Sequence, residues 1–187
     1  MRNQKISFIF FLSLFISFYS YSQRCDSILW SGYNTLQWKH FKGYPDRNSS
    51  ASALSEASIN YHFSRTSNLI NFKFFCSFST CGSWIKAATS YSLLEHEQAH
   101  FDLAEYYKRL MVKEVISQKF TSANILEKVQ AIATRINSLR IEADELYDIE
   151  TNYSRNDEKQ KEWMKKIRKM VKGLDEYDKS SYLVKLN

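Results

Sequence analysis

Two histidines four residues apart, with a glutamate beside the first, are the side chains of this sequence best suited to metal chemistry. They lie in Leu93-Leu94-Glu95-His96-Glu97-Gln98-Ala99-His100-Phe101-Asp102, which contains the pattern H-E-x-x-H. On an α-helix, residues four apart are offset by only about 40°, so the imidazoles of His96 and His100 can bind one ion. Glu97 would then take a proton from a water as that water attacks a carbonyl, as in zinc hydrolases.

The alternative is a helix whose two histidines are ordinary core residues. Six positions share one stripe at helical spacing, so both histidines should face inward: Leu93, His96, His100, Leu103, Tyr107 and Leu110. Burying two imidazoles costs free energy unless each has a partner, and one shared metal serves both. We therefore prefer the metal interpretation.

A catalytic zinc site needs a third protein ligand, because such sites have three protein ligands and an open position. No third histidine follows His100 at the spacing of the longer H-E-x-x-H-x-x-G-x-x-H pattern. An acid from a second helix can complete the set, and Glu142, Glu145 and Asp148 are candidates, although each such acid is more often solvated. Asp102 and Glu105 are candidates to orient a ligand or line the site, whereas an ion pair between Glu105 and Arg109 is the simpler role for Glu105.

The first half of the chain is predicted to form strands. Apolar residues alternate with polar ones over 59–64 and 70–78, which predicts a β-hairpin, and the aromatic-rich stretch 30–41 predicts a short strand with a flanking loop. His62 falls on the polar face of its strand, and His40 precedes a turn signal. We expect both of these histidines on the surface.

The second half is predicted to form three helices. The first should start at Ser92, which forms a capping box with Glu95, and run to about Lys119. The second should be capped by Thr121 or Ser122, and its apolar residues keep a four-three repeat that packs along the first helix: Ile125, Val129, Ile132, Ile136, Leu139, Ala143 and Leu146. The third should begin at Asn156 and end at Gly173. The fold class is therefore α+β, with an N-terminal antiparallel sheet packed on long C-terminal helices.

The first 22 residues have the features of a cleaved signal peptide, with a basic head, an apolar run and small residues before Gln23. Residues 23–187 then form a single domain, exported to the periplasm or secreted, with no stable membrane insertion after cleavage. Without Arg2 and Lys5 the chain has 24 basic and 20 acidic residues, a net charge of +4. The basic cluster at 165–172 fits a solvated helix face, so no nucleic-acid partner is expected.

Three cysteines leave one without an intramolecular partner. Cys76 and Cys81 are close enough in sequence to close a small loop. In an oxidising compartment we favour this pair over either pairing with Cys25.

The sequence resembles the bacterial domain-of-unknown-function family 922, whose members look like exported zinc-dependent peptidases. The resemblance begins at Leu36-Gln37-Trp38-Lys39-His40-Phe41-Lys42-Gly43, passes through Ser83-Trp84 and the H-E-x-x-H segment, and resumes at Tyr147-Asp148-Ile149-Glu150-Thr151, Gln160 and Trp163.

This resemblance implies that His96 and His100 bind zinc and that Glu97 is the general base. The family pattern usually has a histidine two residues after the threonine, a natural third ligand, but this chain has Tyr153 there. The third ligand is then Tyr153 as a phenolate or Asp148 as a substitute.

Three functions follow. The leading one is an exported zinc metallopeptidase of zincin-like fold that acts on peptide or protein substrates. The second is a catalytically reduced metal-binding or scaffold protein of the cell envelope. The third, a helical interaction module with core histidines, requires the motif to be a coincidence.

Overall fold

A long antiparallel hairpin is the main element of the sheet. The computed structural model describes residues 25–33, 35–86 and 90–187. In it β3 (Ala57–Thr66) pairs with β4 (Leu69–Ser79) along its whole length, as the alternating pattern predicted. Alternate residues of β4 are buried, because a strand turns successive side chains to opposite faces: Ile70, Phe72, Phe74, Cys76 and Phe78.

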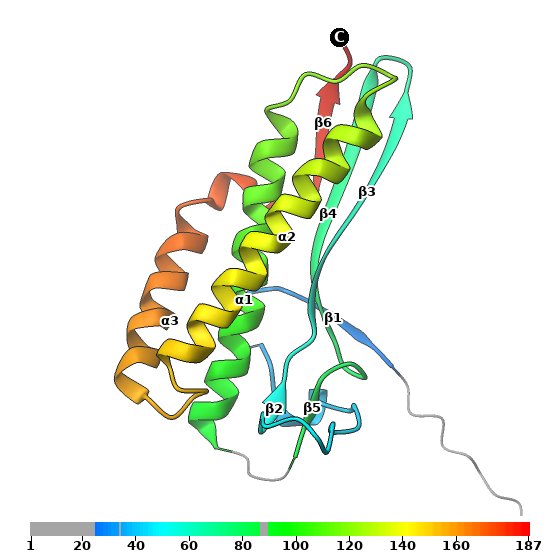
Figure 1. Ribbon diagram of the computed structural model, residues 1–187. Helices are drawn as coiled ribbons and strands as arrows, with labels where there is room; N and C mark the ends of the chain where they lie inside the picture. Colours follow the sequence, from blue (N-terminus) through cyan, green and yellow to red (C-terminus); the bar gives the residue numbers. More distant parts are fainter. Residues whose placement is uncertain (1–24, 34, 87–89) are drawn as a thin grey trace, which may run out of the picture.

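Two shorter strands complete this sheet on the edge of β4 opposite β3 (Figure 1). β1 (Ser27–Leu29) pairs with the end of β4, and β6 (Ser181–Lys185) pairs with its beginning. A second, two-stranded sheet consists of β2 (Ala53–Leu54) and β5 (Trp84–Ile85).

The strand predicted over 30–41 is wrong. The strand lies earlier, at 27–29, and residues 38–40 form a 3₁₀ helix, η1 (Trp38–His40). Successive aromatic residues of the stretch 30–41 are three to five positions apart, which is not the period of two that a strand requires: Trp30, Tyr33, Trp38 and Phe41.

Three helices follow the strands: α1 (Tyr91–Ile116), α2 (Ile125–Glu150) and α3 (Asp157–Lys172). The bounds of α3 agree with the prediction. α1 begins earlier than expected, because the Ser90 hydroxyl accepts the Leu93 amide at 3.0 Å. α2 begins later, with Asn124 as its cap. A second 3₁₀ helix, η2 (Asp175–Tyr177), precedes β6.

α1 is the central helix of the molecule, and it packs against β3, β4, α2 and α3 (Figure 1). Buried residues therefore occur on most of its circumference, including His96, Glu97 and Gln98. The main apolar core lies between the sheet, α1 and α2, and contains these buried residues: Ile70, Phe72, Phe74, Met111, Val112, Val115, Phe120, Ile125, Val129 and Ile136.

The apolar repeat of α2 holds at its start and fails at its end. Val129 and Ile136 are fully buried, whereas Leu146 is 45% exposed and Tyr147 is 0% exposed in its place. An α-helix has 3.6 residues per turn, so a seven-residue repeat drifts by about 20° per heptad and by about 60° over three heptads. The buried face has consequently moved on to Tyr147.

The disulfide joins Cys25 to Cys81, so the predicted Cys76–Cys81 pair is wrong. Ser27 of β1 lies opposite Ser79 of β4, and this register continued by two residues places Cys25 opposite Cys81. Cys76 faces the core from β4 as a free thiol, and burial raises its pKa well above the usual value.

The predicted signal peptide, residues 1–22, lies outside the described residues. None of the helices in the described part of the chain combines the length and apolar character that crossing a membrane requires. The cluster at 165–172 is an exposed face of α3, with Lys165, Arg168 and Lys172 on the surface.

Candidate metal centre

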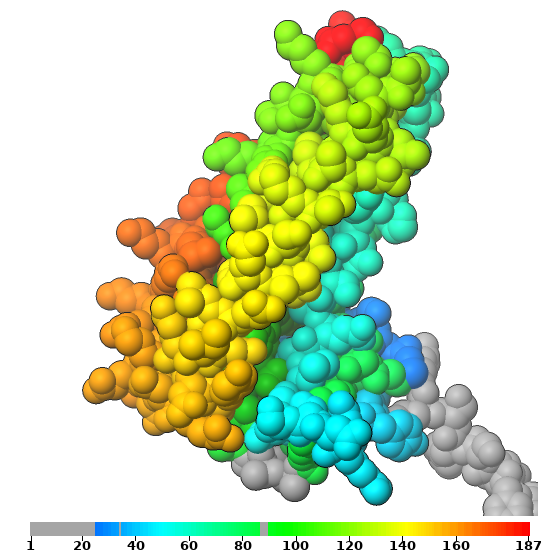
Figure 2. All heavy atoms as spheres, in the orientation of Figure 1, coloured from blue at the N-terminus to red at the C-terminus, as the bar shows by residue number. Residues whose placement is uncertain are grey.

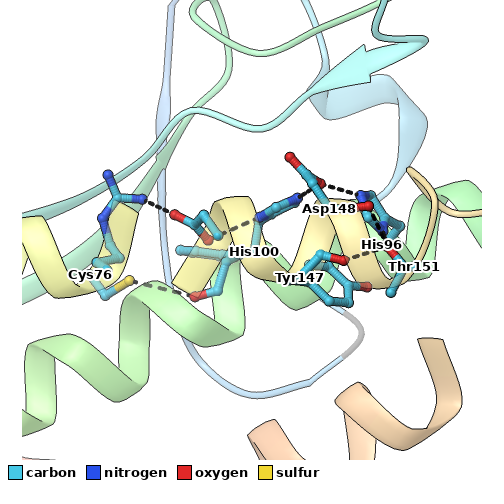
Figure 3. A network of polar contacts seen from close by, with 9 residues as sticks. Cys76, His96, His100, Tyr147, Asp148 and Thr151 are labelled. Atoms are coloured by element: carbon cyan, nitrogen blue, oxygen red, sulfur yellow. Dashed lines mark hydrogen bonds and ion pairs between the residues drawn. The ribbon is translucent and has the colours of Figure 1, made fainter. Parts of the chain in front are cut away.

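The two motif histidines meet one carboxylate of α2. His96 and His100 lie on the same face of α1, and their ring centroids are 4.9 Å apart. Oδ1 of Asp148 is 3.0 Å from Nε2 of His96 and 3.0 Å from Nε2 of His100 (Figure 3). Helix α2 therefore contributes a third candidate ligand to the pair from α1.

The other ring nitrogen of each histidine faces an oxygen atom of α2 or of the residue that ends it. Nδ1 of His100 is 3.0 Å from Oδ1 of Asp144. Nδ1 of His96 is 3.5 Å from Oγ1 of Thr151, whose hydroxyl donates to the Tyr147 carbonyl at 2.7 Å. An Nδ1–H on either ring thus finds an acceptor, which leaves Nε2 for a metal.

Arg140 fixes Asp144 in this arrangement. Its Nη1 donates to Oδ2 of Asp144 at 2.6 Å, while Oδ1 of the same carboxylate faces His100. Tyr147 supports the other histidine, because its ring stacks on His96 with centroids 4.6 Å apart. Asp144 and Tyr147 thus each hold one of the two imidazoles.

These donors suit a transition-metal ion. One atom from each of His96, His100 and Asp148 lies within 4.8 Å of the other two. Ligands about 2.0 Å from a tetrahedral ion are about 3.3 Å apart, close to the 3.0 Å from Asp148 to each imidazole. Two imidazoles favour zinc, iron, nickel or copper over calcium or magnesium, and this donor set is not specific to zinc.

The carboxylates of Asp144 and Asp148 favour positive charge on the neighbouring imidazoles. Burial would raise the pKa of Asp148, but hydrogen bonds from His100 and His96 hold it well below its usual value. Burial would lower the pKa of His100, but hydrogen bonds to Asp144 and Asp148 raise it to about 10. A metal that binds here therefore displaces a proton from Nε2 of His100, since imidazole binds metals in its neutral form.

The other candidate third ligands lie differently. Tyr153 is 52% exposed and follows α2 in a turn, although it lines the same pocket as the histidines. Glu142 and Glu145 are exposed on α2. Of the acids proposed from sequence, Asp148 is the one in contact with both imidazoles.

Glu97 lies with the histidines in the wall of a cavity of about 450 Å³. Its side chain is buried, with 3% exposed. The opposite wall is the segment 50–55, which includes β2. Figure 2 shows this segment (cyan) facing the end of α2 (yellow), with atoms of α1 (green) between them.

Asp102 and Glu105 have other partners. Oδ1 of Asp102 accepts from Nε1 of Trp30 and from Nε2 of Gln98, both at 2.8 Å, and burial raises the pKa of Asp102 to about 6. Glu105 makes the predicted ion pair with Arg109, at 2.7 Å. Asp102 joins Trp30 to α1, and Glu105 pairs within α1, so neither acid has a histidine of the centre among its partners in the described residues.

The remaining histidines lie away from the centre. His62 is exposed on β3, as predicted. His40 is half-buried at the end of η1, where its Nδ1 accepts the Gln37 amide at 3.0 Å.

Asp144 and Arg140 were not predicted as site residues from the sequence, and Thr151 had no predicted role of its own. A signal was present, because Asp144, Tyr147, Asp148 and Thr151 have the spacing i, i+3, i+4, i+7 of one helical face. The exposed Glu142 and Glu145 belong to other faces of α2.

No protein-family model, curated protein or solved structure matched the chain when it was compared with each collection. The assignment of the metal centre accordingly rests on the contacts described above.

Proposed function

We propose that this chain is an exported zinc metallopeptidase with a zincin-like domain, as its resemblance to the bacterial domain-of-unknown-function family 922 implies. One observation carries the proposal. The Nε2 atoms of His96 and His100 both lie 3.0 Å from Asp148, and Glu97 lines the same pocket. Together these groups would supply three ligands and a general base.

His96, His100 and Asp148 would hold the ion, and Asp148 would take the place of the family histidine that is Tyr153 here. When bound, zinc polarises a peptide carbonyl and makes a water more acidic. Glu97 accepts the proton of the attacking water and passes it to the leaving amine. Because Glu97 is buried, few solvent molecules compete with the attacking water for its carboxylate.

Strand β2 would hold the substrate. It lines the pocket and pairs with β5 along one edge, and no other strand of the described residues pairs with it. An extended peptide can pair with such an edge through its main chain. Binding of this kind positions a carbonyl group without requiring a particular side chain.

Export is supported by the disulfide between Cys25 and Cys81, because such bonds persist in oxidising compartments. The apolar run that precedes these residues in the sequence fits a signal peptide cleaved near Gln23. We propose that the mature domain acts in the periplasm or outside the cell.

The test is peptide hydrolysis by the zinc-loaded mature domain and its Glu97→Gln variant. We expect hydrolysis by the wild type and a loss of at least about a hundredfold in Glu97→Gln, which should keep its zinc. Glu95→Gln is the matched control, because Glu95 lies on the same helix and does not line the pocket.

A metal-binding scaffold is the alternative, and it is favoured by Tyr153 in place of a histidine. In that case the wild type binds zinc and hydrolyses none of a library of peptides of mixed sequence. Equal hydrolysis by the wild type and Glu97→Gln would also reject Glu97 as the base.

A further inference from the structure

Two arginines share the pocket with the candidate metal ligands. Arg140 comes from α2, one turn before Asp144, and Arg155 comes from the turn that follows α2. The opposite wall carries small side chains, including Ser50, Ala51 and Ser52. The lining of the pocket thus combines two arginines, from α2 and the turn after it, with small side chains of the segment 50–52.

Arg140 is fixed and has donors to spare. Its Nη1 donates to Asp144 at 2.6 Å, and its Nε is buried without a hydrogen-bond partner among the described residues, so the remaining Nη donors are the ones that can face a ligand. A guanidinium has five N–H donors in a rigid fork, so one bond to Asp144 orients the group and leaves others for a ligand. The side chain is 20% exposed, which keeps part of it accessible from the pocket.

Arg155 is placed by an unusual turn. Asn152, Tyr153 and Ser154 have φ angles of 49°, 53° and 70°, a backbone conformation that residues other than glycine rarely adopt. Backbone bonds hold the turn, from the Tyr153 amide to the Asp148 carbonyl and from the Asn156 amide to the Thr151 carbonyl, both at 2.8 Å. Strain of this kind is typical of functional sites, and here the strained turn supplies two pocket residues, Tyr153 and Arg155.

Two of the acids in the pocket already have partners. Asp144 is bonded to Arg140 and His100, and Asp148 is bonded to both histidines. Arg155 makes no ion pair within the described part of the chain and is exposed. An anionic group that enters the pocket therefore meets unsatisfied guanidinium donors.

We infer that Arg140 and Arg155 bind a carboxylate of the substrate and so make the site selective for peptides that present a carboxylate group. This inference rests on the proposed peptidase function and adds the class of its substrate. Guanidinium groups pair with carboxylates through charge-assisted hydrogen bonds, often two at a time. The carboxylate is either an Asp or Glu side chain or the C-terminus of the peptide.

Peptide binding to the zinc-loaded Glu97→Gln mature domain tests the inference without requiring catalysis. Fluorescence anisotropy is measured with three labelled peptides: one rich in Glu with an amidated C-terminus, its Gln analogue, and the Gln analogue with a free C-terminal carboxylate. We expect a carboxylate peptide to bind about tenfold or more tighter than the amidated Gln peptide, and less so at high salt. The Glu peptide and the free-terminus peptide distinguish the two sources.

Three arginine variants identify the residues. Arg155→Gln and Arg140→Gln should each remove most of the preference for carboxylate peptides. Arg140→Lys keeps a positive charge beside Asp144 and loses the planar fork of guanidinium donors. Arg135→Gln is the matched control, because Arg135 lies on the same helix, pairs with Glu114 and does not line the pocket. Zinc content and thermal melting are measured for each variant to identify loss of metal or of folding.

Equal binding of the three peptides, no binding of any, or a preference that survives both Arg155→Gln and Arg140→Gln overturns the inference. The proposed function is judged separately. Hydrolysis by the wild type without preference for a carboxylate rejects the inference alone, and binding of a carboxylate peptide without hydrolysis by the wild type rejects the peptidase alone.

Discussion

Replacing Asp144 by Asn should weaken zinc binding although Asp144 is not itself a candidate ligand. Its Oδ1 lies 3.0 Å from Nδ1 of His100, and its side chain is only 18% exposed. Asn keeps the shape and one acceptor oxygen but removes the negative charge that stabilises the Nδ1–H. Loss of such a partner typically weakens metal affinity about 10- to 100-fold, or about 1.4–2.8 kcal/mol.

The equivalent change at the other histidine should be smaller. Oγ1 of Thr151 is 3.5 Å from Nδ1 of His96, at the limit of hydrogen bonding, and it carries no charge. We therefore expect Thr151→Val to weaken zinc binding by less than about threefold. The structure thus predicts an order of effects, with Asp144→Asn well above Thr151→Val.

The assay is competition for zinc with a chromophoric chelator at neutral pH, with folding checked by circular dichroism. Glu145→Gln is the control, because Glu145 is an exposed acid on the same helix. An affinity of Asp144→Asn within about threefold of the wild type, or a larger loss in Thr151→Val, would refute the assigned roles of these partners.

Three further results are expected. Removing zinc with a chelator should lower the melting temperature of the wild type by about 5–10 °C, if zinc had been at a hundred times its dissociation constant. The melting temperature of His96→Ala should stay unchanged, and equal shifts in the two proteins would contradict binding at this site. Replacing Cys25 and Cys81 by Ser should lower the free energy of unfolding in urea by up to about 4 kcal/mol, because their disulfide closes a loop whose ends are 56 residues apart. Thiol titration of the denatured wild type should find Cys76 as its one free thiol. Tyr147→Phe should leave the free energy of unfolding unchanged or raise it by up to about 1 kcal/mol, because the buried hydroxyl has no hydrogen-bond partner among the described residues. A decrease of more than about 1 kcal/mol would contradict this and reveal such a partner.

The parts of the fold that sequence predicted are those set by local periodicity. The hairpin follows from alternation in β3 and β4, and α3 follows from the caps Asn156 and Gly173. Pairing over long distances has no comparable local signal. The Cys25–Cys81 bond depends on the register of β1 against β4, and β6 is a strand because it completes the edge of β4.

The candidate site was predictable to the extent that it lies on one helix. His96, Glu97 and His100 carry their geometry in their spacing, whereas Asp148 was one of several acids on α2. The drift of the seven-residue repeat turned Tyr147 inward, and with it the face that carries Asp144 and Asp148. Identifying the ligand among these acids therefore required knowing how α2 is rotated about its axis.

The metal content of the purified mature domain, measured by elemental analysis, tests the central claim most directly. After zinc is supplied at neutral pH, we expect close to one zinc per chain in the wild type and in Tyr153→Phe, and a loss of most of it in His96→Ala and in Asp148→Ala. Wild-type protein without metal, or zinc that persists in Asp148→Ala and is lost in Tyr153→Phe, would contradict the centre formed by His96, His100 and Asp148.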